Sequence, residues 1–139
     1  MTGGRAGHDG SADAVRRFFS AFGRGDVDGL VAAFHPEALV AAVREGPRDG
    51  GIHGAYRGHA GVREFVGALG AALETEAFEV DGVVGEGDVA FASGRFRHRV
   101  RSTGRPFESA WALRCRVRDG LIQEFRFYED SAAYEAARR

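Results

Sequence analysis

The spacing of apolar residues near the start of the chain predicts a helix. Val15, Phe18, Phe19 and Phe22 recur at the three-to-four-residue interval that places side chains on one helical face. Ser11 or Asp13 could cap this helix, and Gly25 would end it.

Two further helices are expected before the chain becomes strand-like. Asp26 or Asp28 can cap a short second helix, which ends at His35-Pro36 because proline cannot continue a helix. A strand at residues 39–43 and a Gly-rich loop at 46–51 follow. A third helix begins at Gly58, with an apolar face that extends to Leu73.

The second half of the chain alternates apolar and polar residues with the period of two that is typical of strands. Four strands are predicted, at about residues 76–85, 88–101, 106–118 and 121–129, with a helical tail after residue 130. The order predicts an α+β fold with a curled antiparallel sheet, in which three N-terminal helices enclose a cone-shaped pocket. One domain is expected over residues 11–137, after a disordered, Gly-rich start at residues 1–10.

Two turns predict how the last three strands pair. Thr103-Gly104 and Asp119-Gly120 each have the composition of a two-residue hairpin loop. A two-residue loop fixes the strand register, so His98 is expected opposite Ser109, and Ser109 opposite Asp130.

Both registers agree on which side of the sheet is apolar. The face expected to point inward holds Phe96, His98, Val100, Phe107, Ser109, Trp111, Leu113, Cys115, Val117, Ile122, Glu124, Arg126, Tyr128 and Asp130. The face expected to point outward holds Arg95, Arg97, Arg99, Arg101, Glu108, Arg114, Arg116, Phe125 and Phe127.

Polar residues on the inward face suggest a site. Strands lie about 4.8 Å apart, so long side chains at His98 and Asp130 could approach each other across the small Ser109. A buried histidine and carboxylate form a plausible acid/base pair. Alternatively, His98 is a satisfied polar residue of the core, and Asp130 caps the C-terminal helix.

Aromatic residues would shape the pocket around this pair. Arg126 shares a strand with Glu124, either as a pocket ion pair that positions a polar substrate or as rim residues in water. Such aromatic residues are more often part of an ordinary core than of a ligand platform, but on a concave sheet they could serve as both. They are Phe18, Phe22, Phe96, Trp111 and Tyr128.

The outward face, where Phe125 and Phe127 lie among arginines, predicts a homodimer, because arginine and aromatic residues are enriched at interfaces. The formal net charge of −1 argues against a nucleic-acid-binding module, which has a basic excess.

Other classes of protein are disfavoured. Cys115 is the one cysteine, so no intrachain disulfide or Cys-based zinc site can form. No His/Asp/Glu spacing is typical of a metal site. No apolar run is long enough to span a membrane, and the first ten residues lack the apolar core of a signal peptide. A cytoplasmic protein without membrane contact is therefore expected.

Five segments carry a resemblance that extends over residues 11–137. They are GRGDVDGL (23–30), FHPEA (34–38), YRGHAGVREFV (56–66), STGRPF (102–107) and VRDGLIQEFRFYEDSAAYEAA (117–137). In order and spacing they resemble the SnoaL-like branch of the NTF2-like superfamily, a fold that hosts isomerases, cyclases, hydrolases, dehydratases and non-catalytic proteins.

Within this resemblance, the catalytic residues of three enzyme types can be compared with the matching positions of this chain. The tyrosine and base aspartate of ketosteroid isomerases fall on Phe18 and near Ala42, which disfavours that chemistry. The Asp-Arg-Asp set of limonene-epoxide hydrolases lacks a match in RFRHRVR (95–101). Polyketide cyclases of the SnoaL type carry an acid/base aspartate that matches Asp130, with an inward histidine that His98 could supply.

Two functions follow. The first is a cofactor-free cyclase, isomerase or lyase acting on a carbonyl compound, in which Asp130 abstracts a proton and His98 or Arg126 stabilises the enolate. The second is a non-catalytic small-molecule-binding or assembly domain that uses the same pocket.

Overall fold

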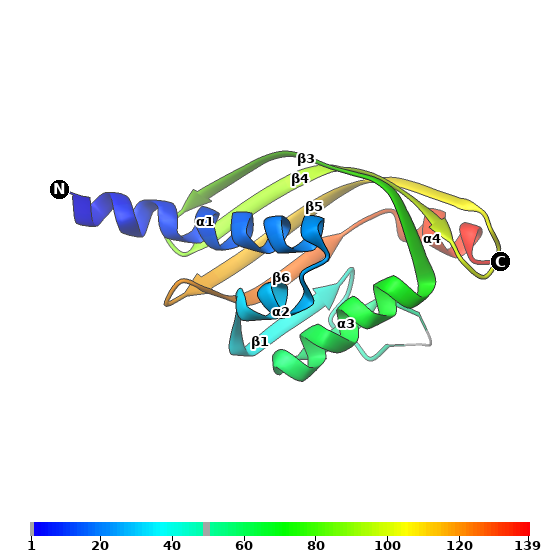
Figure 1. Cartoon of the computed structure of the whole chain (residues 1–139), viewed down its shortest axis with the longest axis horizontal. Coiled ribbons are helices and arrows are strands. Elements are labelled where there is room, and N and C mark those ends of the chain that lie inside the picture. Colours follow the sequence, from blue (N-terminus) through cyan, green and yellow to red (C-terminus); the bar gives the residue numbers. More distant parts are fainter. Residues whose placement is uncertain (1, 49–50) are drawn as a thin grey trace.

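The structure is a computed structural model that describes residues 2–48 and 51–139, with side chains from residue 10 onward. One six-stranded sheet is partly covered by helices, as Figure 1 shows. The helices are α1 (Thr2–Arg24), α2 (Val27–Ala32), α3 (Gly58–Ala72) and α4 (Ser131–Ala137). The strands are β1 (Phe34–Ala42), β2 (Gly54–Arg57), β3 (Leu73–Glu86), β4 (Val89–Val100), β5 (Pro106–Arg118) and β6 (Leu121–Tyr128).

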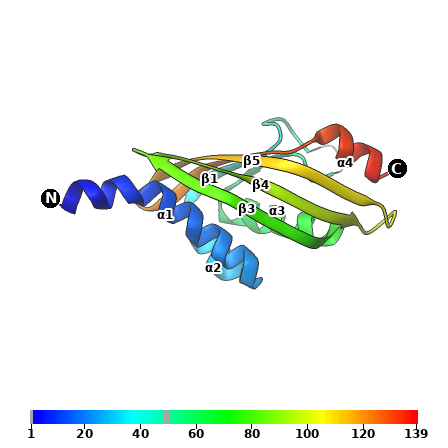
Figure 2. The same cartoon turned by 90° about the horizontal axis from the view of Figure 1, so that it is seen from above.

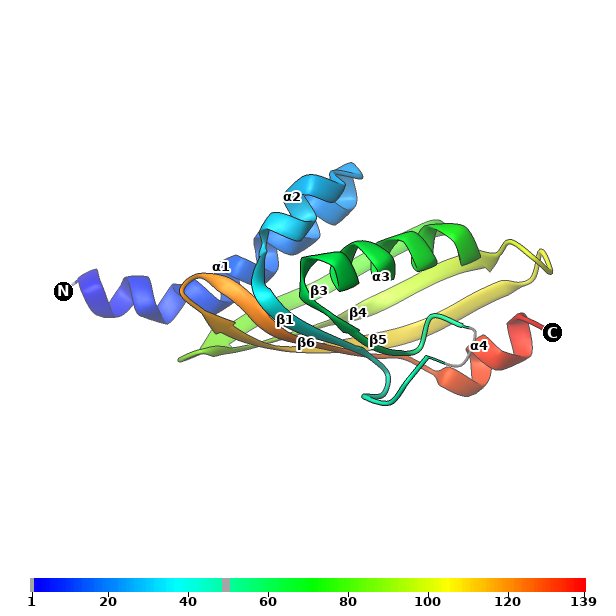
Figure 3. The same ribbon diagram turned by 90° about the horizontal axis from the view of Figure 1, so that it is seen from below.

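The sheet is curled but not closed, and its strand order is β2-β1-β6-β5-β4-β3. All neighbours are antiparallel except β1 and β6, which run parallel. The helices α1, α2 and α3 lie on the same side of the sheet, as seen in Figure 3. The predicted α+β fold with three N-terminal helices is therefore confirmed.

The predicted boundaries of the first two helices were wrong in part. The first helix already runs through Ser11 and Asp13, so neither residue caps it. Asp26 caps α2 by accepting a hydrogen bond from the Gly29 amide at 2.9 Å, but the helix ends before Phe34, which opens β1. The short strand β2 was not predicted.

Residues 1–10 were predicted to be disordered. Met1 lies outside the described residues, and only the backbone is described from residue 2 to residue 9. Neither this expectation nor the domain boundaries are tested, and both stay predictions.

The hairpin between β4 and β5 differs from the predicted one by two residues. The connection is not a two-residue loop at Thr103-Gly104: it covers residues 101–105, with Gly104 in the left-handed conformation (φ 74°). His98 therefore lies opposite Phe107, and Phe96 lies opposite Ser109. A shift of two residues keeps every side chain on its face, so His98 and Ser109 are buried as expected.

The hairpin between β5 and β6 begins as predicted but then changes register. Asp119 and Gly120 both have positive φ, as in a type I′ turn, and Val117 pairs with Ile122 as expected. The next pair is Arg116 with Glu124, so Gln123 is an extra residue, a β-bulge.

The bulge reverses the predicted direction of the side chains in the rest of β6. Phe125 pairs with Cys115, is 1 % exposed and belongs to the core, whereas Tyr128 is 45 % exposed. The predictions that Arg126, Tyr128 and Asp130 point inward and that Phe125 and Phe127 point outward were therefore wrong. The predicted homodimer rested on the outward position of Phe125 and Phe127, so that reason for a dimer no longer applies.

The core lies between the helices and the inner face of the sheet. Phe125 is near its centre, with its ring 4.8 Å from that of Phe18, 5.5 Å from Phe34 and 6.1 Å from Phe65. Cys115 is fully buried, and burial raises the pKa of its thiol above the ordinary value. No helix in the described part of the chain is long and apolar enough to cross a membrane.

Gly94 allows the large indole of Trp111 to lie across the neighbouring strand. The two residues are paired in the sheet. A Cβ atom at Gly94 would collide with the Glu79 carbonyl oxygen and would lie 2.7 Å from Cζ2 of Trp111. Glycine is needed here because of this close approach.

We expect Gly94→Ala to destabilise the protein by about 1–3 kcal/mol, the usual cost of overpacking a core. Gly67→Ala is the control, because no atom lies within 4 Å of the added methyl group in the middle of α3, and alanine favours a helix by about 1 kcal/mol. Urea denaturation of both variants measures the difference. Equal stability of the two variants would contradict the packing described here.

Candidate functional site

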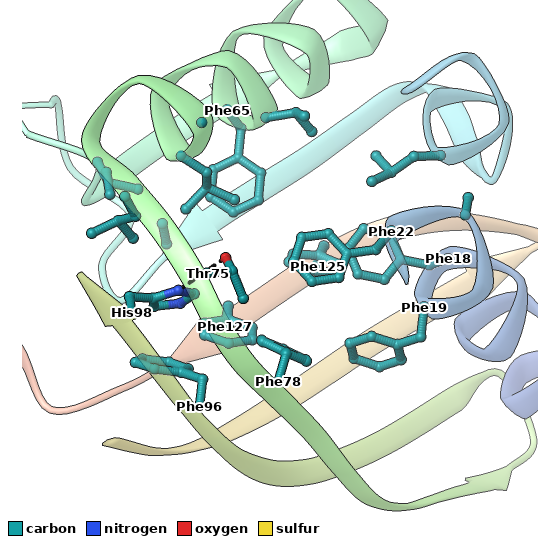
Figure 4. A pocket seen from close by; sticks show the side chains of 18 of the residues that line it. Phe18, Phe19, Phe22, Phe65, Thr75, Phe78, Phe96, His98, Phe125 and Phe127 are labelled. Carbon is teal, nitrogen blue, oxygen red and sulfur yellow. Dashed lines mark hydrogen bonds between the residues drawn. The ribbon is translucent and has the colours of Figure 1, made fainter. Parts of the chain in front are cut away.

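A cavity of about 210 Å³ lies between the helices and the inner face of the sheet. Its walls come from α1, α2, α3, the strands β1, β3, β4 and β6, and the loop after β1. Eight phenylalanines dominate these walls, and all of them are labelled in Figure 4. They are Phe18, Phe19, Phe22, Phe65, Phe78, Phe96, Phe125 and Phe127. The exposed residues of the wall are Gly25 and Val27 at the α1–α2 turn, Gly70 near the end of α3 and Thr75 in β3, and they mark where the cavity opens.

His98 is one polar residue of this apolar wall. It is 6 % exposed, and its Nδ1 lies 3.0 Å from the Thr75 hydroxyl, a contact drawn in Figure 4. Desolvation lowers the pKa of His98 from 6.5 to about 4, because burial disfavours the charged ring. The imidazole is therefore neutral at physiological pH.

A second polar group combines Glu129 and His53. The carboxylate oxygen Oε2 of Glu129 lies 2.8 Å from Nε2 of His53, and the side chains are only 11 % and 8 % exposed. An ionised carboxylate can only accept, so His53 donates this hydrogen bond. Both residues line the cavity, and no other hydrogen bond to Glu129 is found in residues 10–48 and 51–139.

A row of aromatic rings connects the two polar groups of the cavity wall. The rings of His98 and Phe107 are 6.1 Å apart, and those of Phe107 and Tyr134 are 5.3 Å apart. The His53 ring in turn lies 4.8 Å from Tyr134, which belongs to α4. The row of rings thus runs from His98 past Phe107 to Tyr134 of α4 and on to His53.

Four of the residues predicted for the site line the cavity. They are Phe18, Phe22, Phe96 and His98. Trp111 is buried one layer further out, with its ring against Phe19, Phe78 and Phe127 at 5.1–5.4 Å. Its Nε1 has no hydrogen-bond partner among the described residues.

The remaining predicted residues lie outside the cavity wall. Ser109 is buried, but its hydroxyl accepts a hydrogen bond from the Asp130 amide at 3.0 Å. Asp130 is exposed and caps α4, where its carboxylate accepts from the Ala133 amide at 3.0 Å. Arg126 points to the other face of the sheet and binds Glu45 at 2.7 Å, which raises the pKa of its guanidinium.

Sequence reasoning missed Glu129, His53 and Thr75. The signal for Glu129 was the alternation Phe125, Phe127, Glu129, which is a consistent inward face once the bulge is allowed for. His53 had no signal, because it reaches the cavity from an irregular loop. Within the described residues, no group of three His, Cys, Asp or Glu side chains is arranged to hold a metal ion.

Solved structures with the same fold are numerous. An NTF2-like protein of Burkholderia xenovorans is 28% identical, with 95% of this chain and 98% of that chain covered and a TM-score of 0.83. An NTF2-like protein of Burkholderia thailandensis is 25% identical, with 93% and 97% covered and a TM-score of 0.82. A candidate polyketide cyclase of Xanthomonas campestris pv. campestris shares the fold at 18% identity, with 96% and 99% covered and a TM-score of 0.77.

A search of curated protein sequences finds no significant match. The family model described as the SnoaL-like domain matches residues 15–125, which include the C-terminal part of α1, all of α2, α3 and β1 to β5, and most of β6. Because this match covers most of the chain and agrees with the observed fold, the protein belongs to the SnoaL-like domain family.

Proposed function

We propose that this protein is an enzyme that performs acid/base chemistry on a small carbonyl compound, as an isomerase, cyclase or lyase without a cofactor. The observation that carries the proposal is the presence of a buried carboxylate, Glu129, and a neutral histidine, His98, in one phenylalanine-lined cavity. Similarity in fold to proteins described as candidate polyketide cyclases supports it as an analogy.

Glu129 is assigned the role of the base. Its carboxylate accepts a proton from the carbon next to the carbonyl group, and the electron pair of the broken C–H bond moves into the carbonyl to form an enolate. Returning the proton to another carbon completes an isomerisation. In a cyclase, the enolate attacks a second carbonyl, whose oxygen then takes the proton from Glu129. In a lyase, the enolate expels a leaving group, which takes that proton. His53 orients Glu129 through their hydrogen bond.

His98 is assigned the stabilisation of the enolate oxygen. In the tautomer in which Nδ1 accepts a hydrogen bond from the Thr75 hydroxyl, the neutral ring carries its proton on Nε2 and can donate it to the oxygen. A donor fixed in an apolar cavity stabilises developing negative charge more strongly than the same donor in water. Thr75 is then a positioning residue.

This assignment differs from the one that the sequence favoured. Asp130 was the expected base and Arg126 a possible partner, but Asp130 is an exposed helix cap and Arg126 binds Glu45 on the other face. Glu129, the immediate neighbour of Asp130, has the carboxylate that lines the cavity.

The decisive experiment compares Glu129→Gln with Asp130→Asn. Deuterium exchange at the acidic carbon of simple 1,3-dicarbonyl probes, followed by NMR, should fall about 10²- to 10⁴-fold in Glu129→Gln, because the amide cannot accept the proton. Asp130→Asn should keep the wild-type rate, since asparagine is an equally good cap. If Asp130→Asn alone loses exchange, Asp130 is the base. If neither variant changes a measurable rate, neither residue is the base. If the wild type shows no exchange, the proposed chemistry is ruled out.

The neutral state of His98 predicts a dependence of stability on pH. The unfolded ring protonates near pH 6.5 and the folded ring only near pH 4, so the unfolded state takes up more protons between these values and stability falls as the pH is lowered. The difference in unfolding free energy between wild type and His98→Asn should therefore shrink from pH 7 to pH 4 and be level above pH 7. Denaturant titrations at several pH values measure it, and a constant difference would show that His98 is not buried as described.

The second part of the proposal is a homodimer through the outer face of the sheet. The outer face carries Val84, Phe91 and Tyr128, which are 67 %, 49 % and 45 % exposed. In Figure 2 and Figure 3, the helices α1, α2 and α3 lie on the opposite side of the sheet. Large exposed apolar residues among charged ones are typical of interfaces.

A cytoplasmic location stays a prediction.

Light scattering at micromolar concentration should give twice the mass of one chain. Phe91→Asp should shift the protein to a monomer, whereas Val27→Asp, at an exposed residue of α2 on the other side of the sheet, should not. A monomeric wild type would rule out this dimer.

A further inference from the structure

The described wall of the cavity carries negative charge without a permanent positive charge to balance it. Its described wall contains the carboxylates of Asp26 and Glu129 and no arginine, and the chain has no lysine. His98 is neutral at physiological pH because of its burial. His53 already donates its Nε2 proton to Glu129.

An anionic ligand would therefore lose its hydration without gaining a counter-charge. Transfer of a carboxylate into an apolar site is costly unless it is paired, and Glu129 would add repulsion at short range. Asp26 contributes less to this repulsion, because it lies near the opening and its carboxylate already binds Arg24 at 3.3 Å. The carboxylate of Glu129 is the main obstacle to an anion.

The size of the cavity limits the ligand to about one ring. A dry cavity of about 150 Å³ lined by Leu, Ile and Phe holds benzene. The 210 Å³ available here leaves room for a six-membered ring with a small substituent. Fused polycyclic compounds would require the phenylalanine wall to move.

The distribution of polar groups determines how a ligand would be oriented in the cavity. In Figure 4, His98 and Thr75 lie on one side of the cavity, while Phe18, Phe19 and Phe22 lie on the other. Phe125, Phe127 and Phe78 lie between them in this view and provide ring faces for stacking. A ligand with one polar oxygen and one apolar body matches this arrangement.

We propose that the ligand of this cavity is an uncharged carbonyl compound of single-ring size, bound with its oxygen toward His98 and its ring among the phenylalanines. The site discriminates against carboxylates and phosphates of the same size and against fused polycyclic ketones. The inference rests on the proposed function, because it treats this cavity as the working site and deepens the substrate class.

Binding can be measured without turnover. Saturation-transfer NMR and calorimetry at pH 7.5 would use acetophenone and cyclohexanone as neutral probes, benzoate and phenyl phosphate as anionic probes, and 9-acetylanthracene as a polycyclic probe. The neutral single-ring ketones should bind saturably, the anions at least about tenfold more weakly, and the anthracene ketone should not bind.

Variants locate the binding and test its cause. Phe127→Trp adds bulk to the cavity wall and should abolish acetophenone binding, whereas Phe91→Trp on the outer face should leave it unchanged. Leu69→Phe, at another wall position, repeats the test if Phe127→Trp does not fold. Glu129→Gln should reduce the preference for acetophenone over benzoate, because it removes the negative charge.

Three results would overturn the inference: benzoate binding as tightly as acetophenone, preferred binding of the anthracene ketone, or no binding of any neutral ring. Its failure is distinguishable from failure of the proposed function. Selective binding of neutral rings without proton exchange would support the proposed ligand class and contradict the proposed catalytic function. Glu129-dependent proton exchange on a charged or polycyclic compound would support the proposed catalytic function and contradict the proposed ligand class.

Discussion

The β-bulge at Gln123 is the constraint on which the cavity depends. The type I′ turn at Asp119-Gly120 fixes Val117 opposite Ile122, and both side chains point into the core. If the strand continued without interruption, Glu124 and Arg126 would follow them inward at the cost of burying two charged groups. One extra residue instead turns Phe125 and Phe127 inward.

The same bulge determines where the chemistry can occur. It aligns Phe125 with Val40 and Phe127 with Ala42 in the parallel pairing with β1, so the centre of the sheet packs against Phe18 and Phe65 from the helices. Two residues beyond Phe127, at the end of the strand, Glu129 continues the inward alternation and meets His53. The apolar wall and the carboxylate are thus two results of a single shift in register.

Most of the fold could be predicted from the sequence, because helical and strand periodicities depend on local spacing. His98 and Phe96 were placed on the correct face although the first hairpin was misjudged, because an error of two residues preserves the alternation. Glu129 was missed because a bulge of one residue reverses the inward-outward alternation of the side chains. Nothing local in the sequence marks Gln123 as the extra residue. His53 could not be predicted, because its position depends on how the loop after β1 packs against α4.

The direct test of this account is the pairing of β5 with β6 in solution, read from cross-strand backbone nuclear Overhauser effects. The structure predicts contacts of Cys115 with Phe125 and of Leu113 with Phe127. Contacts of Leu113 with Arg126 and of Trp111 with Tyr128 would mean that the strand has no bulge. In that case Glu129 would point away from the cavity, and the catalytic assignment would be wrong.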